Sequence, residues 1–159
     1  MRILFVCMGN ICRSPAAECV FVDRLAGAGL DGEIFVDSAG TTAFHTGEPP
    51  DPRMQKALQS RNYQVRGRAR PVTAEDYRKF DLILAMDRAN LRDLEARRPV
   101  DASATIKLFG AYCGKTPGAE VPDPYYGGEA GFARVMDMLE DGSDALLAEI
   151  QQSRPPRPS

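Results

Sequence analysis

The sequence predicts an α/β protein, a single domain with a four-stranded parallel sheet and helices on both faces. Two observations lead to this fold class. Short, continuous apolar runs alternate along the chain with segments whose apolar residues recur at helical spacing. Strands buried on both faces and joined by helical crossovers produce that alternation. A chain of 159 residues also has the length of one domain.

The first strand is expected at residues 3–6, where four apolar side chains follow one another. A helix is expected at 16–28, because apolar residues lie three and four positions apart there. Ser14 is the expected N-cap, and Pro15 suits the first helical position. Gly29 is expected to end this helix.

The later elements continue the alternation. The expected strands lie at 34–36, 81–85 and 105–109, and the expected helices at 53–60, 88–97 and 132–150. Asp87 is placed to cap the second of these helices. Two loops rich in proline and glycine, 38–52 and 121–128, separate neighbouring elements. We expect the domain to span 1–153 and to be followed by a frayed, proline-rich tail, 154–159.

The composition is that of a soluble globular protein, with 43% hydrophobic and 26% charged residues. A net charge of -2 gives no reason to expect nucleic acid or an anionic membrane as a partner. No apolar run approaches the roughly 18 residues that a membrane span needs, and the N-terminus has no signal-peptide pattern. We therefore expect a cytoplasmic protein. The sequence does not predict its oligomeric state.

The counts of cysteine and histidine restrict the chemistry. The four cysteines form no CxxC pair, so a structural zinc site is not expected. Cys19 and Cys113 are expected to be small buried residues. His45 is the single histidine, which excludes a multi-histidine metal site. We expect no metal and no cofactor, and acid–base chemistry from Asp, Glu, Cys or Tyr side chains.

The segment from Cys7 to Ser14 lies between the first strand and the first helix. A loop that enters a helix N-terminus turns backbone N–H groups toward a site where the helix dipole favours negative charge. Gly9 and Asn10 suit the left-handed backbone angles of a tightly wrapped loop. Arg13 offers a planar fork that matches two oxygens of a phosphate. The sequence thus predicts a phosphate-binding loop after the first strand.

A cysteine at the start of this loop changes the prediction from binding to catalysis. The helix N-terminus and Arg13 both stabilise a thiolate on Cys7. That thiolate lies in line to attack the phosphorus, while the loop amides stabilise the equatorial oxygens. Ser14 is placed to donate a hydrogen bond to the thiolate.

The leaving group also needs an acid. Asp123 is a candidate because the prolines on either side hold its backbone stiffly. The residues alone do not separate it from the other aspartates near expected strand ends, which are Asp37, Asp51, Asp81 and Asp87.

Four segments together resemble the low-molecular-weight protein tyrosine phosphatases over nearly the full length. In order they are VCMGNICRSPAAE (6–18), DSAGT (37–41), DLI with MD (81–83 and 86–87) and DPYY (123–126). The resemblance implies that Cys7 is the nucleophile and Arg13 the phosphate clamp. It implies that Asp123 acts first as the acid and then as the base that activates water on the phosphocysteine.

The resemblance also implies the remaining site residues. Asn10, Ser14 and Ser38 form a hydrogen-bond network that holds the loop. Substrate contacts come from the loop and from aromatic walls, which together comprise Met8, Gly9, Asn10, Ile11, Cys12, Ser14, Ser38, Phe44, Tyr125 and Tyr126. The implied substrates are phosphotyrosine-containing proteins, with inorganic phosphate as product.

Two positions depart from the family pattern. Phe44 stands where members often carry Trp or Tyr, and Gly67 stands where many carry a histidine that supports the loop. We expect catalysis to survive with a less rigid loop. Nearby arginines, which are expected to form a solvated basic face or to attract acidic substrates, are Arg61, Arg66, Arg68 and Arg70.

Three other functions share part of this pattern. Arsenate reductases of this fold need further cysteines near the third strand, and residues 80–98 contain none. Protein-arginine phosphatases carry threonine at the position of Ile11, whose apolar side chain favours an aryl group. A phosphate-binding module without activity needs neither Cys7 nor an acid.

Cys12 lies five positions after the nucleophile. It is interpreted either as a small buried residue or as the partner of a redox switch. In the second case an oxidised Cys7 closes a disulfide with Cys12, which protects it from irreversible oxidation.

Overall fold

The computed structural model describes residues 1–116, 120–125 and 127–154. Its four strands form one parallel sheet in the order β2-β1-β3-β4. The strands are β1 (Arg2–Cys7), β2 (Phe35–Gly40), β3 (Leu82–Ala85) and β4 (Thr105–Leu108). The predicted α/β fold with a four-stranded parallel sheet is confirmed.

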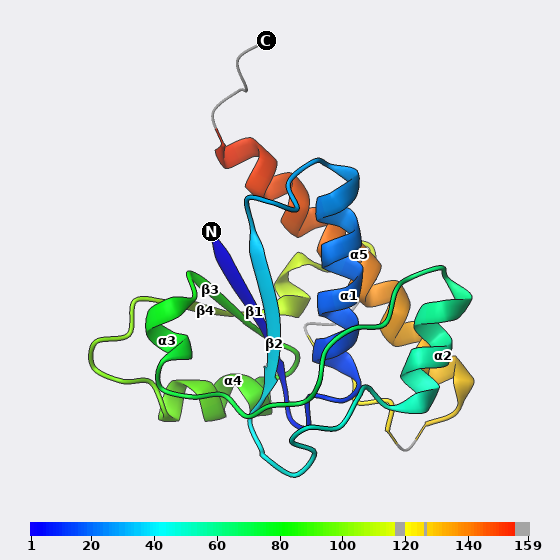
Figure 1. Ribbon diagram of the computed structural model, residues 1–159, viewed down its shortest axis with the longest axis horizontal. Coiled ribbons are helices and arrows are strands. Elements are labelled where there is room, and N and C mark those ends of the chain that lie inside the picture. The colour runs from blue at the N-terminus through cyan, green and yellow to red at the C-terminus, as the bar shows by residue number, and fades with distance from the viewer. Residues whose placement is uncertain (117–119, 126, 155–159) are drawn as a thin grey trace.

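Helices cover both faces of the sheet (Figure 1). One face carries α1 (Arg13–Gly27), α5 (Glu129–Ser153) and the short 3-10 helix η1 (Phe109–Tyr112), with α2 (Pro52–Ser60) packed against α5. The other face carries α3 (Asp76–Lys79) and α4 (Arg88–Ala96). No helix in the described part of the chain has the length and apolar character needed to cross a bilayer.

The central strand β1 supplies both halves of the core, because successive side chains of a strand point to opposite faces. Phe5 faces α1 and packs edge-to-face against Phe21 at 5.9 Å and Phe109 at 6.0 Å. Leu4 and Val6 face α3 and α4 and are fully buried. Truncating a buried ring such as that of Phe5 to alanine lowers the free energy of unfolding by about 3–5 kcal/mol. The side chains of β1 therefore contribute strongly to the stability of the fold on both faces of the sheet.

The N-cap predicted for the first helix is wrong. The helix α1 begins at Arg13, and its N-cap residue is Cys12, whose side chain makes no capping hydrogen bond. Ser14 lies inside the first turn, where its hydroxyl is engaged with Cys7. The first amides of α1 therefore remain available to an oxyanion, as helix N-termini allow.

Two short elements, α3 and η1, were not predicted. Each has four residues, which is too short to display a helical period. The last helix is longer than the expected 132–150, since α5 runs to Ser153. All of the expected tail after Arg154 lies outside the described residues.

The sheet places three strand ends side by side at one edge. Cys7, the last residue of β1, is in register with Gly40, the last residue of β2. Asp87 follows β3, the other neighbour of β1, and caps α4. A Cβ on Gly40 would come within 2.7 Å of the Met8 carbonyl oxygen, so this close approach of the two loops requires glycine.

Candidate active site

Cys7 is 2% exposed and lies at the base of a loop that returns over it. The amide of Asn10 donates to the Cys7 Sγ at 3.3 Å, and the Ser14 Oγ lies 3.0 Å from the same sulfur. Asn10 adopts the left-handed conformation, with φ of 56°, as expected for an Asn in a wrapped loop. A backbone amide and a hydroxyl thus both contact the sulfur.

The Asn10 side chain ties the loop to the rest of the fold. Its Nδ2 donates to the Ser14 Oγ at 2.8 Å and to the Ser38 Oγ at 3.0 Å. Its Oδ1 accepts from the Arg70 amide at 3.0 Å. The structure therefore brings Asn10, Ser14 and Ser38 together behind the nucleophile, in one connected network.

This network continues to a carboxylate that the sequence did not single out. The Ser38 Oγ donates to the Glu18 Oε1 at 2.8 Å, and Glu18 is 4% exposed. Burial raises the pKa of Glu18, and the Arg66 guanidinium, whose Nε lies 3.0 Å from Oε2, acts in the opposite direction. Gly67 has a φ of 90° and lies beside this carboxylate. Arg66, the residue before Gly67, thus forms an ion pair with the Glu18 carboxylate.

Arg13 is 3% exposed and is held from behind. Its Nη1 lies 2.6 Å from the Asp87 Oδ2 and donates to the Val121 carbonyl at 3.1 Å. Burial by itself lowers the pKa of Arg13, but the neighbouring Cys7 and Asp87 raise it by more, so the net pKa is above the ordinary value. The guanidinium therefore stays charged, with its orientation fixed.

The loop surrounds a cavity of about 200 Å³. The residues that line it are Cys7, Met8, Gly9, Ile11, Cys12, Arg13, His45, Asp123 and Tyr125. The Asp123 Oδ2 is 3.6 Å from the Arg13 Nη2, and its Oδ1 accepts from the Tyr125 amide at 3.0 Å. A nucleophile, a cation and a carboxyl group thus converge on one small space, the set that phosphoryl transfer through a cysteine requires.

The other candidate aspartates are engaged elsewhere. Asp87 and Asp37 each form an ion pair with an arginine. Asp51 caps α2, and Asp81 accepts from the Arg2 amide. Among the described residues, Asp123 is the aspartate that lines the cavity.

The expected aromatic walls are placed unequally. Tyr125 lines the cavity, whereas Phe44 is 85% exposed and does not appear among the lining residues. Tyr126 lies outside the described residues. His45 lines the cavity instead, beside Gly9, where an added Cβ would lie 3.1 Å from the His45 Cδ2. Sequence reasoning assigned His45 no role, because nothing in its local pattern indicates which way the loop folds.

Cys12 is 4% exposed and faces the same cavity as Cys7. Burial, assisted by the nearby Asp51, raises the pKa of the Cys12 thiol to about 12. Cys19 is buried in the core and Cys113 is half-buried. Cys7 and Cys12 are therefore the two cysteines in the lining of this cavity.

Each of the arginines expected to form a basic face also has a partner within the fold. Arg61 bridges Asp137 and Glu140. The remaining interactions are those of Arg66 with Glu18, Arg68 with the Gly47 carbonyl, and Arg70 with Asp37 and Asp76.

Comparison with known proteins identifies the family. Residues 2–155 match the low molecular weight phosphotyrosine protein phosphatase family. The chain is 49% identical over 151 residues to a putative low molecular weight protein-tyrosine-phosphatase of Synechocystis, which covers 94% of this chain and 96% of the relative. It superposes on a protein tyrosine phosphatase of Entamoeba histolytica with a TM-score of 0.92 at 45% identity, covering 96% of this chain and 97% of that one. A Drosophila arginine phosphatase superposes with a TM-score of 0.90 at 31% identity, covering 97% and 100%. This chain belongs to the low molecular weight phosphotyrosine protein phosphatase family.

Proposed function

We propose that this protein hydrolyses phosphotyrosine in protein substrates through a phosphocysteine on Cys7. The observation that carries the proposal is the convergence of Cys7, Arg13 and Asp123 on one cavity at the end of β1. Membership of the family supports the same activity.

In the first step the Cys7 thiolate attacks the phosphorus, and the bond from phosphorus to the tyrosine oxygen breaks. Asp123 gives its proton to the departing phenolate oxygen. Arg13 and the amides at the start of α1 hold the equatorial oxygens, where charge accumulates. The Asp87 carboxylate keeps the Arg13 guanidinium in place throughout.

In the second step a water molecule attacks the phosphocysteine. Asp123, now a carboxylate, takes a proton from that water as its oxygen bonds to phosphorus. The sulfur–phosphorus bond breaks and the thiolate returns to the hydrogen bonds of the Asn10 amide and Ser14. The product is inorganic phosphate.

Preference for an aryl phosphate is supported by the cavity walls. The cavity lining includes the apolar side chains of Met8 and Ile11 and the aromatic ring of Tyr125. A flat phenyl ring packs well against such walls. A phosphorylated guanidinium would place N–H groups against Ile11, whose side chain offers no acceptor, and a buried N–H without a partner is costly.

The experiment compares three activities of the purified protein in the presence of EDTA. We expect release of phosphate from phosphotyrosine peptides at a kcat/KM well above that for phosphoarginine peptides, and no arsenate reduction with thioredoxin. A preference for phosphoarginine, or a loss of activity that a divalent ion restores, would contradict the proposal.

The location, partners and domain bounds expected from the sequence are also proposals. We propose that the protein acts in the cytoplasm on phosphoproteins and without a metal or cofactor, membrane or nucleic acid. We further propose that residues 1–153 form the folded domain and 154–159 a tail.

A further inference from the structure

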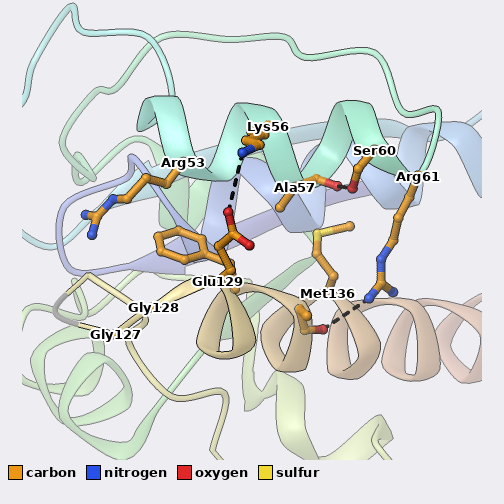
Figure 2. A pocket seen from close by; sticks show the side chains of 11 residues that line it. Arg53, Lys56, Ala57, Ser60, Arg61, Gly127, Gly128, Glu129 and Met136 are labelled. Carbon is orange, nitrogen blue, oxygen red and sulfur yellow. Dashed lines mark hydrogen bonds and ion pairs between the residues drawn. The ribbon is translucent and has the colours of Figure 1, made fainter.

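A second and larger cavity lies between α2 and the first turns of α5. Its volume is about 560 Å³, within the range of ~300–1,000 Å³ typical of ligand pockets. We call it the α2–α5 groove. Its lining residues are Arg53, Lys56, Ala57, Ser60, Arg61, Gly127, Gly128, Glu129, Phe132, Ala133 and Met136. Figure 2 shows side chains of both helices reaching toward one another across it.

The floor of the groove is apolar. Phe132 is 3% exposed and Met136 is fully buried, so they close the floor, and Ala57 and Ala133 present small side chains beside them. Two alanines next to a large aromatic ring leave a hollow that an apolar side chain from elsewhere would fill. Such a hollow with charged groups on its rim is the usual form of a recognition pocket.

The rim of the groove is charged, with the cations on one helix. Lys56 and Arg53 belong to α2, and Arg61 follows it, but both arginines are paired with carboxylates of the fold. The Lys56 Nζ reaches across the mouth to the Glu129 Oε1 at 3.4 Å, and these two side chains are 80% and 91% exposed (Figure 2). An exposed pair of this kind contributes about 0–1 kcal/mol. Lys56 is therefore readily available to a carboxylate of a bound partner.

Arg53 joins the groove to the catalytic cavity. Its Nη1 donates to the Tyr125 carbonyl at 2.7 Å, and its guanidinium lies 5.1 Å from the Tyr125 ring centroid. The same guanidinium lies 5.0 Å from the Phe132 ring in the groove floor. Tyr125 in turn lines the cavity that holds Cys7. The groove thus begins where the wall of the catalytic cavity ends.

We propose that the α2–α5 groove binds the part of the phosphoprotein substrate next to the phosphotyrosine. The segment it fits carries a large apolar side chain, for the floor, and a neighbouring carboxylate, for Lys56. This inference rests on the proposed function, because it deepens the substrate class of the same site. Continuity with the catalytic cavity and the cations of α2 favour a substrate segment over other occupants.

The test uses phosphotyrosine peptides that differ in their flanking residues. One set carries leucine and glutamate on either side of the phosphotyrosine, and the matched set carries glycine and serine. For the wild type we expect kcat/KM about tenfold higher for the first set, a difference that corresponds to about 1.4 kcal/mol. Equal values for the two sets would overturn the proposal and leave the phosphatase activity standing.

Three variants locate the effect. Lys56→Glu reverses the rim charge, and Ala133→Phe fills the floor from an exposed helix position; each is expected to remove most of the tenfold preference. Glu129→Gln frees Lys56 and is expected to increase the preference. The matched controls are Lys107→Glu on β4 and Ala148→Phe on α5, both at exposed positions outside the groove. Both controls should keep the tenfold preference for the leucine–glutamate peptides. If a groove variant lowers turnover of free phosphotyrosine as much as it lowers turnover of the leucine–glutamate peptide, the substitution acts on the catalytic loop. That result would overturn the proposal.

A second readout does not depend on turnover. Methyl NMR of Met136 and Ala133 should shift on addition of the unphosphorylated leucine–glutamate peptide and not on addition of the glycine–serine peptide. If phosphotyrosine is never hydrolysed but these shifts occur, the proposed function fails while peptide docking stands. Concentration-dependent dimerisation that Ala133→Phe abolishes would assign the groove to a second copy of the chain and overturn the proposal.

Discussion

The Ser14 Oγ lies 3.0 Å from the Cys7 Sγ and is also the acceptor of a 2.8 Å hydrogen bond from the Asn10 Nδ2. The Ser14 hydroxyl proton has two acceptors within reach, the Cys7 sulfur and the Ala39 carbonyl at 3.4 Å, and the sulfur is the nearer. A Cys7 thiolate can only accept, so in that state the hydroxyl donates to it. The serine therefore stabilises the thiolate that attacks in the first step and leaves in the second.

We expect Ser14→Ala to lower kcat by about 10- to 100-fold, since a hydrogen bond to a charged group contributes ~1.5–3 kcal/mol. Hydrolysis of the phosphocysteine should slow most, because the thiolate is its leaving group. Stopped-flow assays with p-nitrophenyl phosphate should show a burst of nitrophenol before the steady state. Unchanged kcat, with no burst, would remove Ser14 from the mechanism.

Asp123→Ala should lower kcat by about 10²–10⁴-fold, the usual range for loss of a general acid. The loss should shrink for aryl phosphates whose phenols are strongly acidic, since these depart without a proton. The measurement is kcat across a series of substituted phenyl phosphates. A loss of the same size for every leaving group would show that another residue supplies the proton.

Cys7→Ser should reduce turnover to background and still bind vanadate or phosphate with nearly the affinity of the wild type. The serine hydroxyl is not ionised, whereas Arg13 and the loop amides are unaltered. Calorimetry measures binding and a phosphate-release assay measures turnover. Substantial steady-state turnover by this variant would exclude a phosphocysteine intermediate.

Peroxide should inactivate the enzyme by forming a Cys7–Cys12 disulfide. Peroxide oxidises the Cys7 thiolate to a sulfenic acid, and Cys12 then displaces water to close the bond. Because burial raises the pKa of Cys12 to about 12, its thiolate fraction and the closure rate should increase with pH throughout the neutral range. Phosphate should protect by covering Cys7, and thiol reductant should restore activity.

Cys12→Ser is the control for this switch, and it should retain most activity but recover poorly after peroxide. Mass spectrometry of the oxidised wild type identifies the pair. A disulfide from Cys7 to Cys19 or Cys113 would contradict the prediction, as would equal recovery in Cys12→Ser.

Glu18 should make stability depend on pH. Burial raises its pKa in the folded protein, so the folded state binds the proton more tightly than the unfolded chain. The free energy of unfolding therefore falls as pH rises from the ordinary glutamate range through the raised pKa, and levels off above it. Arg66→Met removes a cation that lowers this pKa, so the decline should extend to higher pH. Since Arg66 is half exposed, the change should be about 1 kcal/mol or less.

Urea unfolding between acidic and neutral pH measures this slope. Arg68→Met is the matched control, because Arg68 donates to a backbone carbonyl instead. Glu18→Gln should flatten the slope. Identical slopes in Arg66→Met and the wild type would show that Arg66 does not act on Glu18.

The sequence was sufficient for the sheet and for the loop around Cys7. The strands β1 and β3 are short apolar runs, whereas β2 continues past the expected 34–36 to Gly40. The loop's residue types follow from its place between a strand and a helix. The family segments then implied roles for Cys7, Arg13 and Asp123. These features are local, so the order of residues reports them directly.

Other parts of the site depend on contacts between distant residues. Asp123 differs from Asp87 in facing the cavity, whereas Asp87 lies behind Arg13, and no local pattern separates them. The pair of Glu18 and Arg66 forms across 48 positions because the chain returns past α1 at that point. The N-cap prediction failed for a related reason: α1 begins one residue earlier, at Arg13, so Ser14 lies inside the first turn, where its hydroxyl contacts Cys7 and Asn10.

The central place of β1 has a consequence for the newly made chain. The nucleophile and Arg13 belong to the first elements to leave the ribosome, and β2 supplies the Ser38 that completes their network. Asp87 and Asp123, the two carboxylates beside Arg13, are synthesised far later, and α5, which packs on α1, comes last. A partly synthesised chain thus contains the nucleophile before it contains the acid. Hydrolysis of the substrate, which needs Asp123, therefore requires that the C-terminal third of the chain has packed against the first strand and helix.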